Sequence, residues 1–170
     1  RDVIECRELV ILGRDNKKII DYIDEMSKFG FNVRKVDSSA ELCKLSNLIV
    51  TTTSANESLI RKSDVIPGTH ITAVGSDTPQ KRELDPEILG MAHSLVVDSI
   101  PQCLERGETK YALDLGLVKE ENLLELGKVI DNGEKIRSDK NDISVADLTG
   151  VAVQDIMITN TVYNNLNNKW

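Results

Sequence analysis

The sequence has few of the residues from which metal sites and disulfide frameworks are built, and it lacks a long apolar run. Its 170 residues include three cysteines and two histidines, and none of these has the spacing of zinc ligands. No apolar run approaches the roughly 20 residues of a membrane span. An odd number of cysteines without a signal peptide is typical of a reducing compartment. We therefore expect a cytoplasmic protein that binds no metal and no membrane.

The sequence also has fewer basic than acidic side chains. Lysine and arginine number 21 against 28 aspartates and glutamates, which gives a formal net charge of −7. A chain of this charge is a poor partner for nucleic acid or an anionic membrane surface. The hydrophobic fraction of 40% is ordinary for a soluble globular protein, and the length suggests one domain with a core of its own.

What the sequence does contain is an alternation of short, branched apolar runs and helical patterns. Strands are predicted at Leu9–Leu12, Phe31–Val36, Asn47–Thr53, Ile71–Val74 and Ser94–Val97. Helices are predicted between Asn16 and Gly30, from Ser38 or Ser39 to Leu45, and near Gln80–Leu89, Glu121–Ile130 and Val145–Leu166. Strands that alternate with helices favour an α/β fold with a parallel sheet.

The most informative stretch is His70–Leu84, in which a predicted strand leads into a glycine turn and a polar loop. Gly75 follows the strand, and Ser76, Asp77 and Lys81 come after it. This order places ligands at the carboxyl end of a parallel sheet. The carboxylate of Asp77 and the amine of Lys81 suggest a site for a cofactor and a reacting group. The alternative is a surface loop with a helix cap.

Four segments resemble the ornithine cyclodeaminase and mu-crystallin family, in the family's order and at its spacing. They are Pro67–Pro86 (PGTHITAVGSDTPQKRELDP), Val97–Ser99 followed by Gly107-Glu108, Glu125–Ile130 (ELGKVI) and Asp147–Asp155 (DLTGVAVQD). The resemblance runs from about Val10 to the C-terminus. It implies a Rossmann-like parallel sheet with flanking helices that binds NAD or NADP.

One part of such a fold is missing from the sequence. Dinucleotide folds begin with a strand, a Gly-rich phosphate loop and a helix, but no G-x-G-x-x-G occurs here. In the strand order 3-2-1-4-5-6 the missing first strand is central, so the strands at Leu9 and Leu48 would have unpaired edges. We expect that the N-terminal half of the same protein or a second chain fills this place, or that the remaining strands pair directly.

The resemblance also divides the chain and implies a function. Residues 1–144 would form an NAD(P)-binding Rossmann domain without its first strand. Residues 145–170 would form a C-terminal helix that packs towards a substrate and dimerisation domain outside this chain, so a homodimer is expected. The implied reaction is hydride transfer on a small α-amino or cyclic imino acid, as in ornithine cyclodeaminases, ketimine reductases and amino acid dehydrogenases. The alternatives are a non-catalytic NADPH-dependent ligand-binding protein and an inactive chain that needs a second one.

The resemblance assigns cofactor contacts to residues at the predicted strand ends. They are Gly13, Arg14, Asp15, Thr51, Thr53, Val74, Gly75, Ser76, Lys81 and Leu148. An arginine at the end of the second strand suits the 2′-phosphate of NADP, which favours NADP over NAD. The alternative for Asp15 is a helix cap, and for the threonines it is simple β propensity. Leu148 replaces a hydroxyl residue of the family, so its backbone would make the contact.

Catalysis is assigned by the resemblance to one side chain. Asp77 matches the family's catalytic aspartate, which binds the substrate amine and assists proton transfer or water attack. Mu-crystallin departs from aspartate at this position, so its presence here favours an enzyme. Thr149 is expected to face the cofactor or the substrate. His70 and His93 show no partner pattern, and we interpret both as structural.

Overall fold

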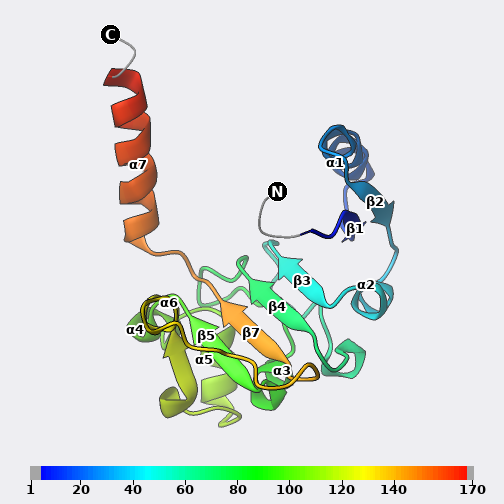
Figure 1. Cartoon of the computed structure of the whole chain (residues 1–170). Helices are drawn as coiled ribbons and strands as arrows, with labels where there is room; N and C mark the ends of the chain where they lie inside the picture. Colours follow the sequence, from blue (N-terminus) through cyan, green and yellow to red (C-terminus); the bar gives the residue numbers. More distant parts are fainter. Residues whose placement is uncertain (1–4, 168–170) are drawn as a thin grey trace.

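The structure is a computed structural model, and it describes residues 5–167 (Figure 1). Its strands, each parallel to its neighbours, are β1 (Glu8–Ile11), β2 (Asn32–Lys35), β3 (Leu48–Thr51), β4 (His70–Ala73), β5 (Ser94–Val97), β6 (Leu123–Glu125) and β7 (Ser144–Asp147). Its helices are α1 (Asn16–Lys28), α2 (Ser39–Leu45), α3 (Pro86–Met91), α4 (Ile100–Cys103), α5 (Glu108–Asp114), α6 (Leu126–Asn132) and α7 (Ala152–Asn167), with 3-10 turns η1 (Lys62–Asp64) and η2 (Glu120–Asn122). The predicted α/β class is confirmed.

The larger sheet has five parallel strands in the order β3-β4-β7-β5-β6. Strand β7 comes from the C-terminal part of the chain, yet it pairs with β4 on one side and with β5 on the other. Its neighbour β5, with the sequence SLVV, is buried along all four residues. Strands buried on both faces read as continuous apolar runs, which is why β5 suits an interior position.

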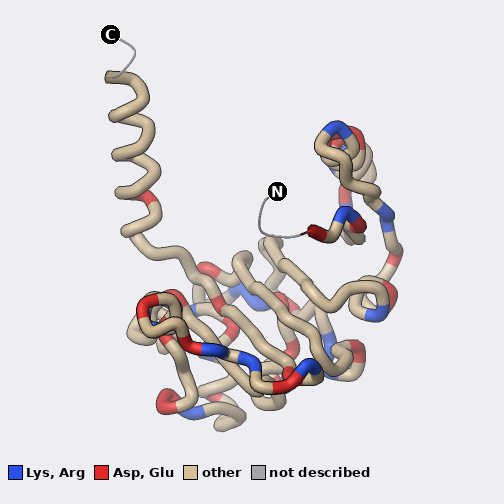
Figure 2. Tube along the Cα trace, in the orientation of Figure 1, with Lys and Arg blue, Asp and Glu red and all other residues tan. Residues whose placement is uncertain are grey.

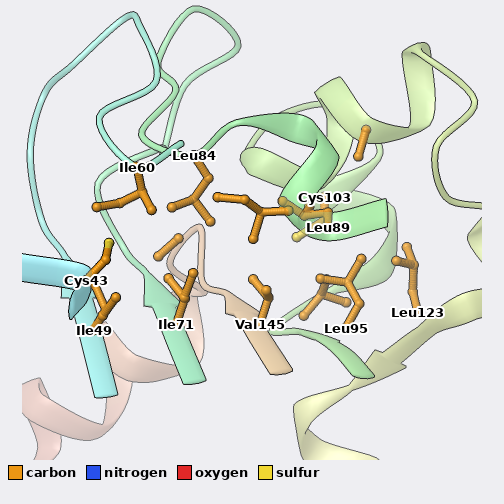
Figure 3. Close-up of a cluster of buried hydrophobic side chains, with 14 residues drawn as sticks. Cys43, Ile49, Ile60, Ile71, Leu84, Leu89, Leu95, Cys103, Leu123 and Val145 are labelled. Atoms are coloured by element: carbon orange, nitrogen blue, oxygen red, sulfur yellow. The ribbon is translucent and has the colours of Figure 1, made fainter. Parts of the chain in front are cut away.

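The main hydrophobic core lies against one face of the larger sheet. Figure 3 shows a row of strand side chains facing a second row from the loops and helices above them. The strand row is Ile49, Ile71, Val145, Leu95 and Leu123. Leu84 and Leu89 are among the residues that cover it. Full burial of one such side chain contributes about 1.5–3 kcal/mol, so this row stabilises the observed strand order.

The first two strands form a separate, smaller sheet. Strand β1 pairs with β2, and α1 contributes the buried side chain of Ile19. Among residues 5–167, β1 pairs only with β2, and β3 pairs only with β4. The prediction of unpaired edges on these two strands is therefore confirmed. The remaining strands do not pair directly with each other across this gap.

Helix α7 stands away from both sheets in Figure 1, and none of its residues is buried. Figure 2 shows it almost without charge, since Asp155 is its one charged residue. Its exposed apolar side chains are Val153, Ile156, Met157, Ile158, Val162, Tyr163 and Leu166. Exposed apolar side chains in such number on one helix are typical of an interface. None of the helices within residues 5–167 is long and apolar enough to cross a membrane.

Two predicted helices are wrong in part, because pairing with distant segments overrides the local helical pattern. The helix predicted near Gln80–Leu89 is an extended loop at its start, where Leu84 forms a bridge with Ile60, and α3 begins only at Pro86. The helix predicted near Glu121–Ile130 begins at Leu126, because the residues before it pair with β5 as strand β6.

The predicted C-terminal helix over residues 145–170 also begins too early. Residues 144–147 form β7, and α7 begins at Ala152. The buried side chain of Val145 lies between the core residues of β4 and β5, which gives this segment its strand conformation. The predicted division between residues 144 and 145 therefore falls inside a strand of the larger sheet. Residues 168–170 lie outside the described part of the chain.

Candidate cofactor and substrate site

The loops that follow neighbouring strands of the larger sheet meet at one edge, which we call the carboxyl edge. Strands β3, β4, β7 and β5 lie side by side and run in the same direction. Pairing continues just past two of them. The Val74 N–H donates to the Thr51 carbonyl at 2.9 Å, and the Leu148 N–H donates to the Ala73 carbonyl at 2.8 Å. The loops after β3, β4 and β7, which hold most of the predicted site residues, are therefore neighbours.

Asp77 lies in the loop after β4 as an exposed carboxylate paired with Lys81. The Lys81 Nζ is 2.6 Å from Asp77 Oδ1, and the Asp77 side chain is 52% exposed. The hydrogen bond from Lys81 lowers the pKa of Asp77 below its ordinary value, so the carboxylate is ionised at neutral pH. Such a group can accept a charge-assisted hydrogen bond from an ammonium or iminium nitrogen. Lys81 itself lies in a loop and not in the predicted helix.

Gly75 is required where the loops after β3 and β4 come into close contact. A Cβ atom at this position would lie 2.1 Å from the Thr53 carbonyl oxygen and 2.6 Å from the carboxyl group of Glu83. No side chain fits at those distances. The close backbone approach at Gly75 is therefore an approach to the neighbouring loop, while an approach to a cofactor stays a prediction.

The other predicted residues of these two loops differ in how accessible they are. Ser76 is buried, and its hydroxyl donates to the Lys81 carbonyl at 2.5 Å, so it shapes the loop. Val74 is 42% exposed at the end of β4. Thr51 is buried, and its Oγ1 has no hydrogen-bond partner among the described residues. Thr53 is exposed, and its Oγ1 accepts a backbone N–H of its own loop at 3.2 Å.

The loop after β7 is held by Asp98 and Gln102. Asp98 Oδ2 accepts the Gly150 N–H at 2.7 Å, and Asp98 Oδ1 accepts the Thr149 hydroxyl at 3.2 Å. Gln102 Nε2 donates to Thr149 Oγ1 at 2.6 Å. The Thr149 hydroxyl is thus engaged as donor and acceptor within the protein. Leu148 is half-buried beside it.

Gly13, Arg14 and Asp15 lie in the other part of the molecule, after β1 in the smaller sheet. All three are exposed. Asp15 caps α1, because its Oδ1 accepts the N–H groups of Lys17 at 3.0 Å and Lys18 at 3.2 Å. The helix-cap alternative for Asp15 is therefore correct as a structural role. Within the described chain, no hydrogen bond or ion pair joins these three residues to the carboxyl edge.

Glu83 is a residue of this edge that sequence reasoning missed. Its side chain is fully buried, and its two oxygens accept the backbone N–H groups of Thr53, at 2.5 Å, and Gly75, at 2.9 Å. This carboxylate therefore joins the loops after β3 and β4 next to the sheet, in addition to the backbone bond from the Arg82 N–H to the Ala55 carbonyl at 2.9 Å. The sequence signal is an acid directly before the apolar Leu84, but that pattern also fits a surface helix, which is what the sequence predicts.

Two further buried acids, Glu108 and Asp147, lie behind Glu83. Glu108 accepts the N–H groups of Glu83 at 2.6 Å and Leu84 at 3.1 Å, and Asp147 accepts the Thr109 N–H at 2.7 Å. Burial raises the pKa of Glu108 to about 8 and that of Asp147 to about 6. Residues 5–167 contain no group of three or more histidine, cysteine, aspartate or glutamate side chains placed to hold a metal ion.

A sequence model of the ornithine cyclodeaminase/mu-crystallin family matches residues 1–170. This chain belongs to that family. The alanine dehydrogenase of Archaeoglobus fulgidus is 32% identical over 168 residues, which are 96% of this chain and 49% of that protein. A protein of Sinorhizobium fredii called uncharacterized cyclodeaminase y4tK is 33% identical over 159 residues, which are 92% of this chain and 48% of that protein. The resemblance seen in the sequence is thus confirmed.

Solved structures of similar proteins share the fold. An archaeal alanine dehydrogenase dimer with bound NAD has a TM-score of 0.88 and 29% identity, over 99% of this chain and 52% of that chain. The Δ1-pyrroline-2-carboxylate reductase of Thermococcus litoralis, in complex with NADH and L-proline, has a TM-score of 0.89 and 25% identity, over 96% of this chain and 51% of that chain. Relatives of this chain are therefore NAD(P)-dependent enzymes of amino or imino acids. The chain spans about half the length of these relatives.

Proposed function

We propose that this chain forms part of the dinucleotide-binding domain of an enzyme that transfers hydride between a nicotinamide cofactor and a small α-amino or cyclic imino acid. The observation that carries the proposal is Asp77, an ionised and exposed carboxylate at the carboxyl edge of a parallel sheet. Ligands of open α/β sheets bind at this edge. The NAD and NADH bound by two similar structures, and the L-proline bound by one of them, support the same assignment.

The residues at the carboxyl edge fit the nicotinamide half of the cofactor. Thr51 has a buried hydroxyl without a partner among the described residues, and Val74 exposes an apolar side chain against which a ring can pack. Thr53, Gly75 and Leu148 bring backbone groups to the same edge. When bound, the nicotinamide supplies or accepts the hydride. The chain has no G-x-G-x-x-G loop for the pyrophosphate, so its own residues account for only part of the site.

Asp77 would bind the nitrogen of the substrate and hold a proton there. Its present partner Lys81 shows that the carboxylate accepts a cation at 2.6 Å, and a substrate ammonium or iminium would take that place. Lys81 would then be released to contact the cofactor. Ser76 keeps the loop in shape through its bond to the Lys81 carbonyl. Thr149, in the neighbouring loop, would face the cofactor or the substrate at the same edge.

The rest of the site would come from outside this chain. The unpaired edges of β1 and β3 can accept a strand between them, and the exposed Leu48 and Val50 of β3 offer that segment apolar contact. The N-terminal half of the same protein or a second chain would supply this strand and the phosphate loop. The apolar surface of α7 would pack on a substrate and dimerisation domain, which makes a homodimer the expected assembly. The three free cysteines support a cytoplasmic location.

Arg14 is the residue through which the protein would prefer NADP over NAD. It is exposed at the end of β1, next to the cap of α1. A guanidinium can form a forked pair of hydrogen bonds with a 2′-phosphate, and NAD offers no such partner. The preference is open to direct test, because both cofactors can be compared on one protein.

The assembled protein, with the segment that completes the sheet, would be tested against L-ornithine, L-alanine, L-proline and the corresponding cyclic imines and oxo acids. The readout is the absorbance of the reduced nicotinamide, in both reaction directions and with both cofactors. Oxidation or reduction of the cofactor by at least one of these compounds is expected. Tight cofactor binding without turnover of any of them would contradict the enzyme assignment and favour a non-catalytic ligand-binding protein.

A further inference from the structure

The loops that carry Thr53 and Asp77 are joined near the sheet by the buried side chain of Glu83, and further out by a backbone bond from the Arg82 N–H to the Ala55 carbonyl at 2.9 Å. We propose that Glu83 is a positioning residue for the proposed reaction, because its carboxylate fixes the separation of these loops and so the place of Asp77 at the carboxyl edge. The inference rests on the proposed function and adds to it a residue that need not touch the substrate or the cofactor.

The Glu83 carboxylate accepts backbone hydrogen bonds at the point where the pairing of β3 and β4 ends. The last backbone bond between β3 and β4 runs from the Val74 N–H to the Thr51 carbonyl. Beyond it, the N–H groups of Thr53 and Gly75 have no backbone acceptor within the described residues, and both donate to Glu83. The carboxylate thus continues the pairing through a side chain, at the point where the two loops leave the sheet.

Only a carboxylate satisfies both donors in this position. Both of its oxygens accept hydrogen bonds, whereas a glutamine has one accepting oxygen and one donating NH₂ group. In Glu83→Gln, one of the two backbone N–H groups would face a donor. The space is also fitted to the carboxylate, since a Cβ atom on Gly75 would lie 2.6 Å from it. A buried donor without an acceptor is costly, so the loops would separate to find water.

The backbone of Glu83 is itself held from two sides. Its N–H donates to Glu108 Oε1 at 2.6 Å. Its carbonyl accepts the N–H groups of Leu59 at 2.7 Å and Ile60 at 3.1 Å. Glu83 lies near the end of the loop after β4, just before α3. These bonds fix its backbone, so its carboxylate can hold Gly75, near the start of the same loop, and Thr53, in the neighbouring loop. Asp77 lies two residues beyond Gly75, so a shift of one loop against the other carries Asp77 with it.

The test compares Glu83→Gln and Glu83→Asp with Glu87→Gln as the matched control, in the assembled protein. Glu87 is exposed, and its carboxylate pairs with Lys62 at 2.6 Å on the surface. A displacement of about 1 Å can cost about 100-fold in rate, and we expect a fall of that size in kcat for Glu83→Gln. Glu83→Asp, which keeps the charge with a shorter reach, should recover part of the loss. Glu87→Gln should have the wild-type kcat.

A second readout separates positioning from stability and does not depend on turnover. Hydrogen exchange of the Thr53 and Gly75 amides should be slow in the wild type and in Glu87→Gln, and fast in Glu83→Gln. A kcat for Glu83→Gln within about twofold of wild type, or fast exchange of both amides in the wild type, would overturn the proposal. If the wild type turns over no amino or imino acid, the proposed function fails, and the exchange rates still decide whether Glu83 holds the two loops.

Discussion

The loops at the carboxyl edge of the larger sheet and the loop after β1 follow the same kind of strand, but they are held differently. At the larger sheet, buried or half-buried carboxylates tie each loop to a neighbour. Glu83 holds the loops after β3 and β4, and Asp98 holds the loop after β7. After β1, Asp15 serves only the helix that follows it, and Arg14 is exposed.

The difference follows from burial. In the larger sheet, β4 and β7 each have a strand on both sides, and the buried acids Glu83 and Asp147 accept backbone N–H groups there. In the smaller sheet, β1 has one neighbour, and its loop stays in solvent, where a charged anchor contributes little. Acids of this chain therefore fix the loops that are proposed to carry Asp77 and the nicotinamide contacts. The loop that carries Arg14 has no such anchor among the described residues.

The largest effect on activity is expected from Asp77→Asn, at the carboxyl edge of the larger sheet. An amide cannot carry the charge that binds a substrate nitrogen or take up its proton, so turnover should fall by about 10²–10⁴-fold. The dissociation constant of the cofactor should change little. The matched control is Asp114→Asn, because Asp114 forms a similar exposed pair with Lys110 in α5. Asp77→Asn with near-normal turnover would refute the catalytic assignment.

Gly75→Ala should break the contact between the two loops. Its Cβ atom would lie 2.1 Å from the Thr53 carbonyl, and a backbone atom cannot step aside as a flexible side chain can. Overpacking of this kind costs about 1–3 kcal/mol or more, measured as the free energy of unfolding. Gly127→Ala is the control, since a Cβ atom there meets nothing within 4 Å and alanine suits the helix. Equal stability of the two variants would show that the loops are less tightly joined than the structure has them.

Glu108→Gln should change how stability depends on pH. Because burial raises the pKa of Glu108 from 4.5 to about 8, the folded protein binds more protons than the unfolded chain between these values. Stability from this group is therefore present below pH 4.5 and is lost as pH rises to about 8, by a total on the order of 5 kcal/mol. The free energy of unfolding of the wild type should fall over that range relative to that of Glu108→Gln, as measured in denaturant titrations. A difference independent of pH would count against the raised pKa of Glu108.

The smallest effect, a change in cofactor binding, is expected from Arg14→Ala in the loop after β1. Loss of a forked guanidinium–phosphate pair should weaken NADPH binding by about 10-fold and leave NADH binding unchanged. Titrations of the assembled protein with both cofactors give the ratio of dissociation constants. Arg61→Ala, an exposed arginine on the other part of the chain, serves as the control. An unchanged ratio would make Arg14 an ordinary surface residue.

The sequence alone predicts the elements whose local signal agrees with their final place. The apolar runs at Ile49 and Leu95 form β3 and β5, because a short run of branched apolar residues between turns is typical of a buried strand. The segments of β6 and β7 carry no such signal. Val145 becomes a strand residue only because β4 and β5 leave a place between them, and that pairing joins parts far apart in the chain.

The same distinction applies to the candidate site. Gly75 and Asp77 are found from turn chemistry and the order of strand, glycine and acid, all within a few residues. Glu83 is not, because its partner Thr53 lies 30 residues away and its burial depends on that contact. The position of Arg14 relative to the carboxyl edge is likewise beyond local patterns, since it depends on the segment that pairs with β1.

In the proposed function, nicotinamide and substrate bind at the carboxyl edge of the larger sheet. Mapping amide chemical shifts of the assembled protein during a titration with NADH tests this most directly. The amide signals of Thr53, Gly75 and Asp77 should shift, while those of His70 and Ser144, at the opposite ends of β4 and β7, should not. Shifts at the opposite ends, with none at the carboxyl edge, would contradict it.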